Sequence, residues 1–147
     1  MIILQHPEIN KITPVFPNKL YLGLTYPLDV NGFYFTDLRS SVGECFVSCP
    51  SEFEAKGGEI KYANRIQPDL IKIHFDTGKK LGYYSLIVSN QMGGDIVNEA
   101  FEVCKNKKSL ASLPKDYLKE LSKLNKLNEK GSRIDLIKNL INFAENK

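Results

Sequence analysis

The sequence is poor in the residues that hold metals and disulfides, since its 147 residues include two histidines, three cysteines and no tryptophan. A structural zinc site takes about four Cys or His ligands, and His6 and His74 stand alone in the sequence. Cys45, Cys49 and Cys104 are an odd number without the spacing of a disulfide framework. In an extended strand the first two would lie about 13 Å apart, too far for a disulfide, and we interpret them as small core residues. We expect no metal, no disulfide and no cofactor.

Long apolar runs and catalytic signatures are also missing. No run approaches the ~20 residues that span a bilayer, and residues 1–7 lack the basic start and apolar core of a signal peptide. We therefore expect a cytoplasmic protein without a membrane partner. Neither histidine has an evident partner, and Gly93-Gly94 lacks the Lys-Ser/Thr of a phosphate-binding P-loop. Asp37 and Arg39 share one face of a predicted strand, as an ion pair would. The sequence predicts a protein that is not an enzyme.

Positive charge is concentrated in the last third of the chain. Residues 105–147 hold eleven Lys or Arg and five Asp or Glu, a balance of +6, whereas residues 1–104 hold nine against twelve, a balance of −3. The two balances give the net charge of +3. A basic tail on a slightly acidic body is typical of nucleic-acid-binding proteins. The alternative is a solvated, lysine-rich helical face.

Alternation of apolar side chains predicts an α+β fold with an antiparallel β-sheet body and one docked helix. We interpret residues 33–51 as a β-hairpin that turns at 40–44, preceded by a turn at 29–32, and place it at the centre of the sheet. Asp95 is a good N-cap for a helix over 95–107, where Val97, Ala100, Phe101 and Cys104 repeat at helical spacing. Residues 109–112 are expected to be a linker. The other predicted strands are 20–26, 60–66, 70–75 and 83–89.

A helical hairpin is expected over residues 113–147. Pro114 suits the first turn of a helix whose apolar stripe follows it, and 125–131 are a polar connection. Ser132 is expected to cap the second helix, with Asp135 three residues later completing a capping box. The chain would therefore consist of a β-rich body over 1–108, including the helix 95–107, and a helical hairpin over 109–147.

The C-terminal segment resembles a SAP motif, a DNA-binding helix–extension–helix module. The shared features are the leucine-rich LKELSKLNKL that begins at residue 118, Gly131, the basic Arg133, the run Asp135-Leu136-Ile137, and Leu140. The resemblance implies DNA contacts from the loop and from the start of the second helix. Free N–H groups at a helix start favour phosphate, and nearby basic side chains release counterions on binding. The implied DNA-binding residues are Lys126, Lys130, Arg133 and Lys138.

Residues 20–66 resemble the SpoVG-type regulators, small bacterial nucleic-acid-binding proteins. The likeness consists of Asp37-Leu38-Arg39, a glycine turn, Phe46-Val47, Pro50-Ser51, Glu59 and Ala63-x-x-Ile66. Members of that family tend to place basic residues after the Pro-Ser pair. Here Glu52-Phe53-Glu54 follows it, and carboxylates repel phosphate. Nucleic-acid binding by the sheet would therefore depend on Lys56, Lys61 and Arg65. Tyr21, Tyr62 and Tyr84 could stack on unpaired bases, with packing in the core or on the surface as the default role of each. Scaffolding or dimerisation is the alternative role of the sheet.

These patterns together predict a non-enzymatic DNA-binding protein, a regulator or an accessory of replication or transcription. Its partner would be DNA, single- or double-stranded. The alternative is a protein-interaction module, such as a phage or mobile-element factor that docks on a replication or transcription machine. A homodimer through the sheet and a separate protein partner both stay open.

Overall fold

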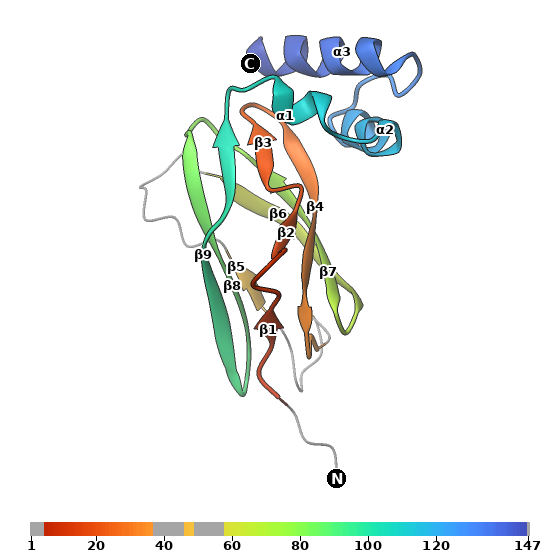
Figure 1. The fold of residues 1–147 in the computed structure, drawn as a ribbon. Coiled ribbons are helices and arrows are strands. Elements are labelled where there is room, and N and C mark those ends of the chain that lie inside the picture. The colour runs from red at the N-terminus through yellow and green to blue at the C-terminus, as the bar shows by residue number, and fades with distance from the viewer. Residues whose placement is uncertain (1–4, 37–45, 49–57, 147) are drawn as a thin grey trace.

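The computed structural model describes residues 5–36, 46–48 and 58–146, which form two β-sheets with three helices at one end (Figure 1). The first sheet has the order β1-β4-β7-β6, with β2 also paired to β4, and all its pairs are antiparallel. Its strands are β1 (Glu8–Ile9), β2 (Val15–Phe16), β4 (Thr25–Phe33), β6 (Glu59–Gln67) and β7 (Leu70–Asp76).

The second sheet has the order β3-β9-β8-β5, in which only the described pair β3–β9 is parallel. Its strands are β3 (Lys19–Tyr21), β5 (Phe46–Ser48), β8 (Gly82–Asn90) and β9 (Gly93–Cys104). The helices are α1 (Lys108–Ala111), α2 (Lys115–Leu124) and α3 (Arg133–Glu145). The predicted α+β class is confirmed, as are the strands expected at 60–66, 70–75 and 83–89 and the C-terminal helical pair.

The core lies between the two sheets and is aromatic at its centre. Phe75 on β7 packs edge-on against Tyr84 on β8 and Phe101 on β9, with ring centroids 5.4 and 4.9 Å apart. Alternate residues of β4 and β7 point into this space, and Leu28 and Ile73 are fully buried. Every second residue of these strands is apolar and faces the space between the sheets. The two sheets therefore pack face to face through these side chains.

The predicted hairpin over 33–51 lies largely outside the described residues. In its described parts, Phe33 ends β4 in the first sheet, residues 34–36 belong to no strand, and β5 pairs with β8 in the second sheet. The expected turn at 29–32 lies inside β4, where Asp29 and Asn31 are half-exposed and alternate with buried Val30. Asp29 and Asn31, which resemble turn residues in the sequence, therefore lie on the outward face of a strand. The turn at 40–44, the pair Asp37 and Arg39, and the first two cysteines lie outside the described residues.

The predicted helix over 95–107 is wrong, because this segment forms most of strand β9. Leu86 pairs with Val97 and Tyr84 with Phe101, so β9 carries two extra residues at a bulge. Glu99 takes a φ of 52° there. The bulge leaves Ala100 and Phe101 both buried, and such neighbouring buried residues interrupt the two-residue alternation and imitate a helical stripe. The expected linker at 109–112 instead includes the end of α1.

The predicted strand over 20–26 is interrupted. β3 ends at Tyr21 and β4 starts at Thr25, with Gly23 between them at a φ of 99°. A Cβ atom at position 23 would lie 2.7 Å from the carbonyl oxygen of Ala144 on α3. Glycine is needed at this position for two reasons, the left-handed φ and the close approach of the helix.

Candidate nucleic-acid interface

The three helices lie together across one end of the two-sheet body (Figure 1). Leu118 and Leu121 of α2 and Leu136 and Leu140 of α3 are fully buried and belong to the same cluster of buried side chains as the sheet residues. The helices therefore complete the core as well as pack on each other, which gives short helices the burial they need.

Polar contacts fix both ends of this helical layer on the strands. Asn125, the C-cap of α2, accepts from the Thr25 amide at 2.9 Å and donates to the Thr25 carbonyl at 2.9 Å. It also donates to the Leu121 carbonyl at 2.8 Å. At the end of α3, the hydroxyl of Tyr21 donates to Glu145 at 2.9 Å. The loop between the two helices thus has a fixed position relative to the body.

The start of α3 carries the predicted capping box. Ser132 Oγ accepts from the Asp135 amide, and the Asp135 carboxylate accepts from the Ser132 amide, each at 3.2 Å. These hydrogen bonds hold the pKa of Asp135 below its usual value, and Lys138 lowers that pKa further. An ionised carboxylate therefore occupies the end of the helix where a phosphate would bind. Any phosphate contact here has to come from basic side chains rather than from the helix start.

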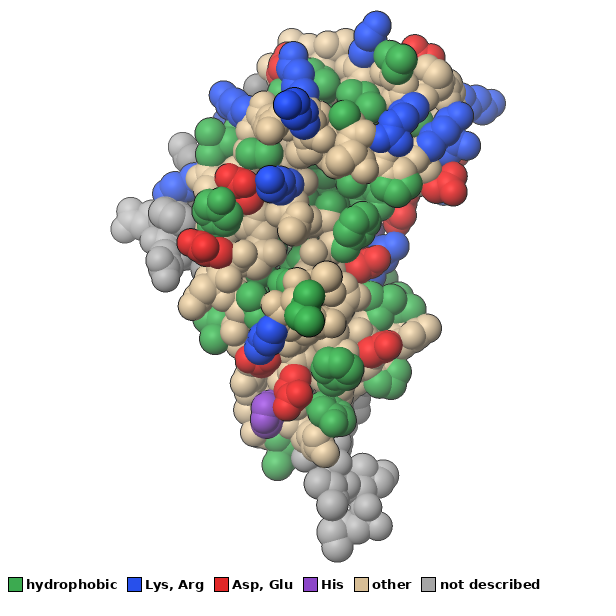
Figure 2. All heavy atoms as spheres, viewed as in Figure 1, with side chains coloured by type: hydrophobic (Ala, Val, Ile, Leu, Met, Phe, Trp, Pro, Cys, Tyr) green, Lys and Arg blue, Asp and Glu red, His purple; other side chains and the backbone are tan. Residues whose placement is uncertain are grey.

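Basic side chains gather over the helical end, where Figure 2 shows most of the blue side chains of its view. We call the nine exposed lysines there the basic end. They are Lys105, Lys107, Lys108, Lys115, Lys119, Lys123, Lys126, Lys130 and Lys138. Within the described chain, none of the nine lies within 4.0 Å of a carboxylate oxygen.

The acidic residues of the same segment are partly engaged elsewhere. Glu120 pairs with Lys72 of β7 at 2.9 Å, and this hydrogen bond raises the pKa of Lys72. Glu145 accepts from Tyr21, and Asp135 belongs to the capping box. The positive charge of the basic end is consequently free to attract an anionic partner.

The structure brings four of the predicted DNA-binding residues into one region. Lys126 and Lys130 lie on the loop between α2 and α3, and Lys138 lies on α3. Arg133, the first residue of α3, is half-buried and donates to the carbonyl of Ala111, so it also ties α1 to α3.

The candidates on the sheet lie apart from this region, on strand β6. Lys61 is paired with Glu59 at 3.2 Å, and half-buried Arg65 donates to the Phe35 carbonyl at 3.4 Å. Lys56 lies outside the described residues.

The three tyrosines considered for base stacking are buried or already in contact with another ring. Tyr21 and Tyr84 are only 4% and 3% exposed, so both pack in the core, which is their default role, and neither offers its ring to a base. Tyr62 is exposed but its ring already packs against His74, with centroids 4.7 Å apart.

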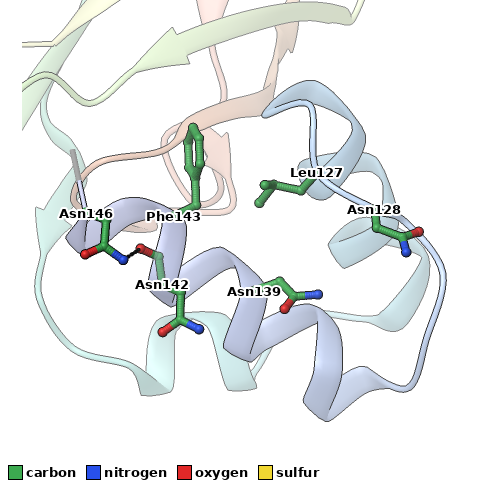
Figure 3. A pocket seen from close by; sticks show the side chains of 6 residues that line it. All are labelled: Leu127, Asn128, Asn139, Asn142, Phe143 and Asn146. Carbon is green, nitrogen blue, oxygen red and sulfur yellow. Dashed lines mark hydrogen bonds between the residues drawn. The ribbon is translucent and has the colours of Figure 1, made fainter.

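A groove lies beside the loop, and none of the predicted site residues lines it. It has a volume of about 470 Å³ and lies between α3 and the loop, where Phe143 and Leu127 are surrounded by carboxamides (Figure 3). We call it the asparagine groove. Its lining residues are Leu127, Asn128, Asn139, Asn142, Phe143 and Asn146. The signal in the sequence is the repeat of asparagines at 139, 142 and 146, which falls on one side of a helix.

Other kinds of site find little support in the part of the chain that the structure describes. No group of three or more His, Cys, Asp or Glu side chains there could hold a metal ion. No helix among these residues is long and apolar enough to cross a membrane.

Comparison with known proteins gives little. No family model matches the sequence, and no curated protein matches it. One solved structure that is similar is an LD transpeptidase in complex with imipenem, at 17% identity and a TM-score of 0.27. The match covers 66% of this chain and 39% of the transpeptidase chain. A likeness this slight carries no argument about activity.

Proposed function

We propose that this chain is a non-enzymatic DNA-binding protein that contacts the phosphate backbone through its basic end. The observation that carries the proposal is the group of nine exposed lysines without a carboxylate partner among the described residues. The SAP-like pattern of residues 113–147 supports the same region. The role would be that of a cytoplasmic regulator or accessory of replication or transcription, with the sheets as scaffold.

The number of contacts gives a quantitative expectation. Phosphate contacts by Lys126, Lys130, Arg133 and Lys138 would release about four counterion equivalents, so log K should fall with log salt at a slope of about −3.6 on duplex DNA. Affinity would then drop about 150-fold between ~50 and ~200 mM salt. Fluorescence anisotropy with a labelled duplex and a labelled single strand measures both quantities.

A charge-matched pair of variants tests where the contacts lie. The double variant Lys126→Gln/Lys130→Gln removes two positive charges from the basic end. The control Ile12→Glu/Gln67→Glu lowers the net charge equally at exposed positions near the opposite end of β4. We expect the first to reduce the salt slope by about two and the control to leave the slope unchanged. If neither duplex nor single strand binds at ~50 mM salt, the proposal fails. A single stoichiometric protein partner would then favour the interaction-module alternative.

A further inference from the structure

A pocket lies where helix α1 packs against strand β3, at the helical end of the molecule (Figure 1). It has a volume of about 330 Å³. One wall comes from residues 16–19, at the turn from β2 into β3, and the other from residues between 106 and 113, around α1. We call it the α1 pocket. It exists only in the folded chain, because its two walls are distant in the sequence.

Hydrogen bonds within the chain hold both walls in place. The Asn18 carbonyl accepts from the Glu102 amide at 2.8 Å, which ties the first wall to β9. On the second wall, the side-chain oxygen of Asn106 accepts from the Lys108 amide at 3.0 Å, and its carbonyl accepts from the Ser109 amide at 3.0 Å. Both of these amides at the start of α1 are therefore used. A ligand in the pocket has to be bound by side chains.

The side chains available to a ligand are mainly donors. Lys19 and Lys108 are exposed and line the pocket, and neither lies within 4.0 Å of a carboxylate oxygen of the described chain. The two N–H donors of the Asn106 carboxamide are bonded to no described residue. The hydroxyls of Ser109 and Ser112 already donate to backbone carbonyls, at 2.7 and 3.3 Å. Two ammonium groups and one amide are thus free to bind a ligand.

The charge around the pocket is positive. No described residue that lines it is acidic, and no Asp or Glu lies within two positions of a lining residue in the sequence. Three further lysines do lie that close, namely Lys105, Lys107 and Lys115. Glu102 stands opposite Lys19 in the β3–β9 register, but it does not line the pocket and forms no ion pair with Lys19. The pocket therefore favours an anion.

We propose that the α1 pocket binds one phosphate of the DNA backbone, with Lys19, Lys108 and the Asn106 amide donating to its oxygens. This inference rests on the proposed DNA-binding function and adds a residue of the sheet body to the interface. Ammonium and amide donors around one phosphate are typical of contacts that position a protein on DNA. Arg133 donates to the Ala111 carbonyl, so the start of α3 is tied to the helix that lines the pocket.

The salt dependence of duplex binding measures the additional contact. One further phosphate changes the expected slope of log K against log salt from about −3.6 to about −4.5. The variant Lys19→Gln/Lys108→Gln should return the slope to about −3.6. The control Ile12→Glu/Gln67→Glu lowers the net charge equally outside the pocket and should leave the slope unchanged.

Exchange of one carboxamide for a carboxylate tests the pocket more locally. Asn106→Asp keeps an oxygen that accepts from the Lys108 amide and replaces the N–H donors by a negatively charged oxygen. Gln67→Glu makes the same chemical change at an exposed position on β6. In fluorescence anisotropy at ~50 mM salt, Asn106→Asp should weaken duplex binding about tenfold more than Gln67→Glu, because it loses a hydrogen bond to a charged group. Equal urea midpoints would show that both variants are folded.

Two other anions identify what the pocket binds. Backbone amide NMR resonances of Lys19 and Lys108 report its occupancy, and we expect the duplex to shift both with the midpoint of its own binding. Shifts caused by inorganic phosphate but not by the duplex would assign the pocket to a free anion and overturn the inference. An oligoglutamate that binds more tightly than the duplex, and loses this binding in Asn106→Asp, would assign it to an acidic protein instead.

The outcomes separate this inference from the proposed function. If both pocket variants bind the duplex as their controls do, while Lys126→Gln/Lys130→Gln weakens binding, the pocket is overturned and the proposed function stands. If neither duplex nor single strand binds at ~50 mM salt, both are overturned.

Discussion

The side chain of Asn125 connects the helical layer to the first sheet, and its removal should destabilise the whole protein. Asn125 is 7% exposed, and its amide meets both the N–H and the C=O of Thr25, the first residue of β4. The side-chain amide thus forms the same pair of hydrogen bonds with Thr25 that the backbone of a neighbouring strand would form. The separation of 100 positions between the two makes this a tertiary contact rather than a local cap.

The expected magnitude follows from the groups left unpaired in Asn125→Ala. A buried polar group without a partner costs about 1–3 kcal/mol, and the low end applies to half-exposed Thr25, which water reaches in part. Two such groups give a loss of about 2–3 kcal/mol in the free energy of unfolding. In a protein of this size that corresponds to a fall in Tm of about 5–10 °C.

Urea unfolding followed by circular dichroism, with a thermal scan, measures both quantities. Asn139→Ala is the matched control, since it deletes an exposed carboxamide on α3 that has no described partner. Its effect should stay within about 0.5 kcal/mol. If Asn125→Ala lost no more stability than this control, the amide would not connect the helices to the sheet as argued.

Four further substitutions or conditions test other contacts. Gly23→Ala should destabilise by about 1–3 kcal/mol, because position 23 has a φ of 99° and faces Ala144; an unchanged urea midpoint would contradict this. Ser132→Ala should cost about 1 kcal/mol by removing the N-cap of α3, which helicity and urea unfolding would reveal. Since the pKa of Asp135 is lowered in the folded state, its contribution should be complete above about pH 4 and be lost as pH falls through the lowered pKa; Asp135→Asn should reduce this acid dependence. Phe101→Ala should cost about 3–5 kcal/mol at the centre of the core, and a smaller loss in urea would show that the aromatic cluster is loosely packed.

Local patterns explain which elements could be predicted. Leu70–Asp76 alternates strictly and forms β7, and Ser132 with Asp135 caps α3 as expected, because each signal lies within a few neighbouring residues. The segment of β9 has a helix-like pattern in the sequence because its bulge places two buried residues, Ala100 and Phe101, side by side. Strand pairing between β5 and β8 could not be predicted either, since it joins residues about forty positions apart.

The candidate site also contains some features that local sequence patterns predict and others that depend on tertiary contacts. Lys126, Lys130, Arg133 and Lys138 could be named from the sequence, because charge and helix capping are local properties. The asparagine groove could not, since the repeat on α3 becomes a groove only when the loop with Leu127 packs against it. Only the tertiary structure shows that Arg133 is partly committed to the Ala111 carbonyl.

The way the helices complete the core decides how the interface has to be tested. Leu118 and Leu140 belong to the same buried cluster as Leu24 and Tyr26 of the sheet region. Deleting residues 109–147 would therefore expose core side chains, and we expect the truncated chain to aggregate rather than to fold as a body without its basic end. Loss of DNA binding in such a truncation would not locate the contacts. Exposed substitutions such as Lys126→Gln and Lys130→Gln leave the buried leucines in place, so a change in salt slope can be assigned to the surface itself.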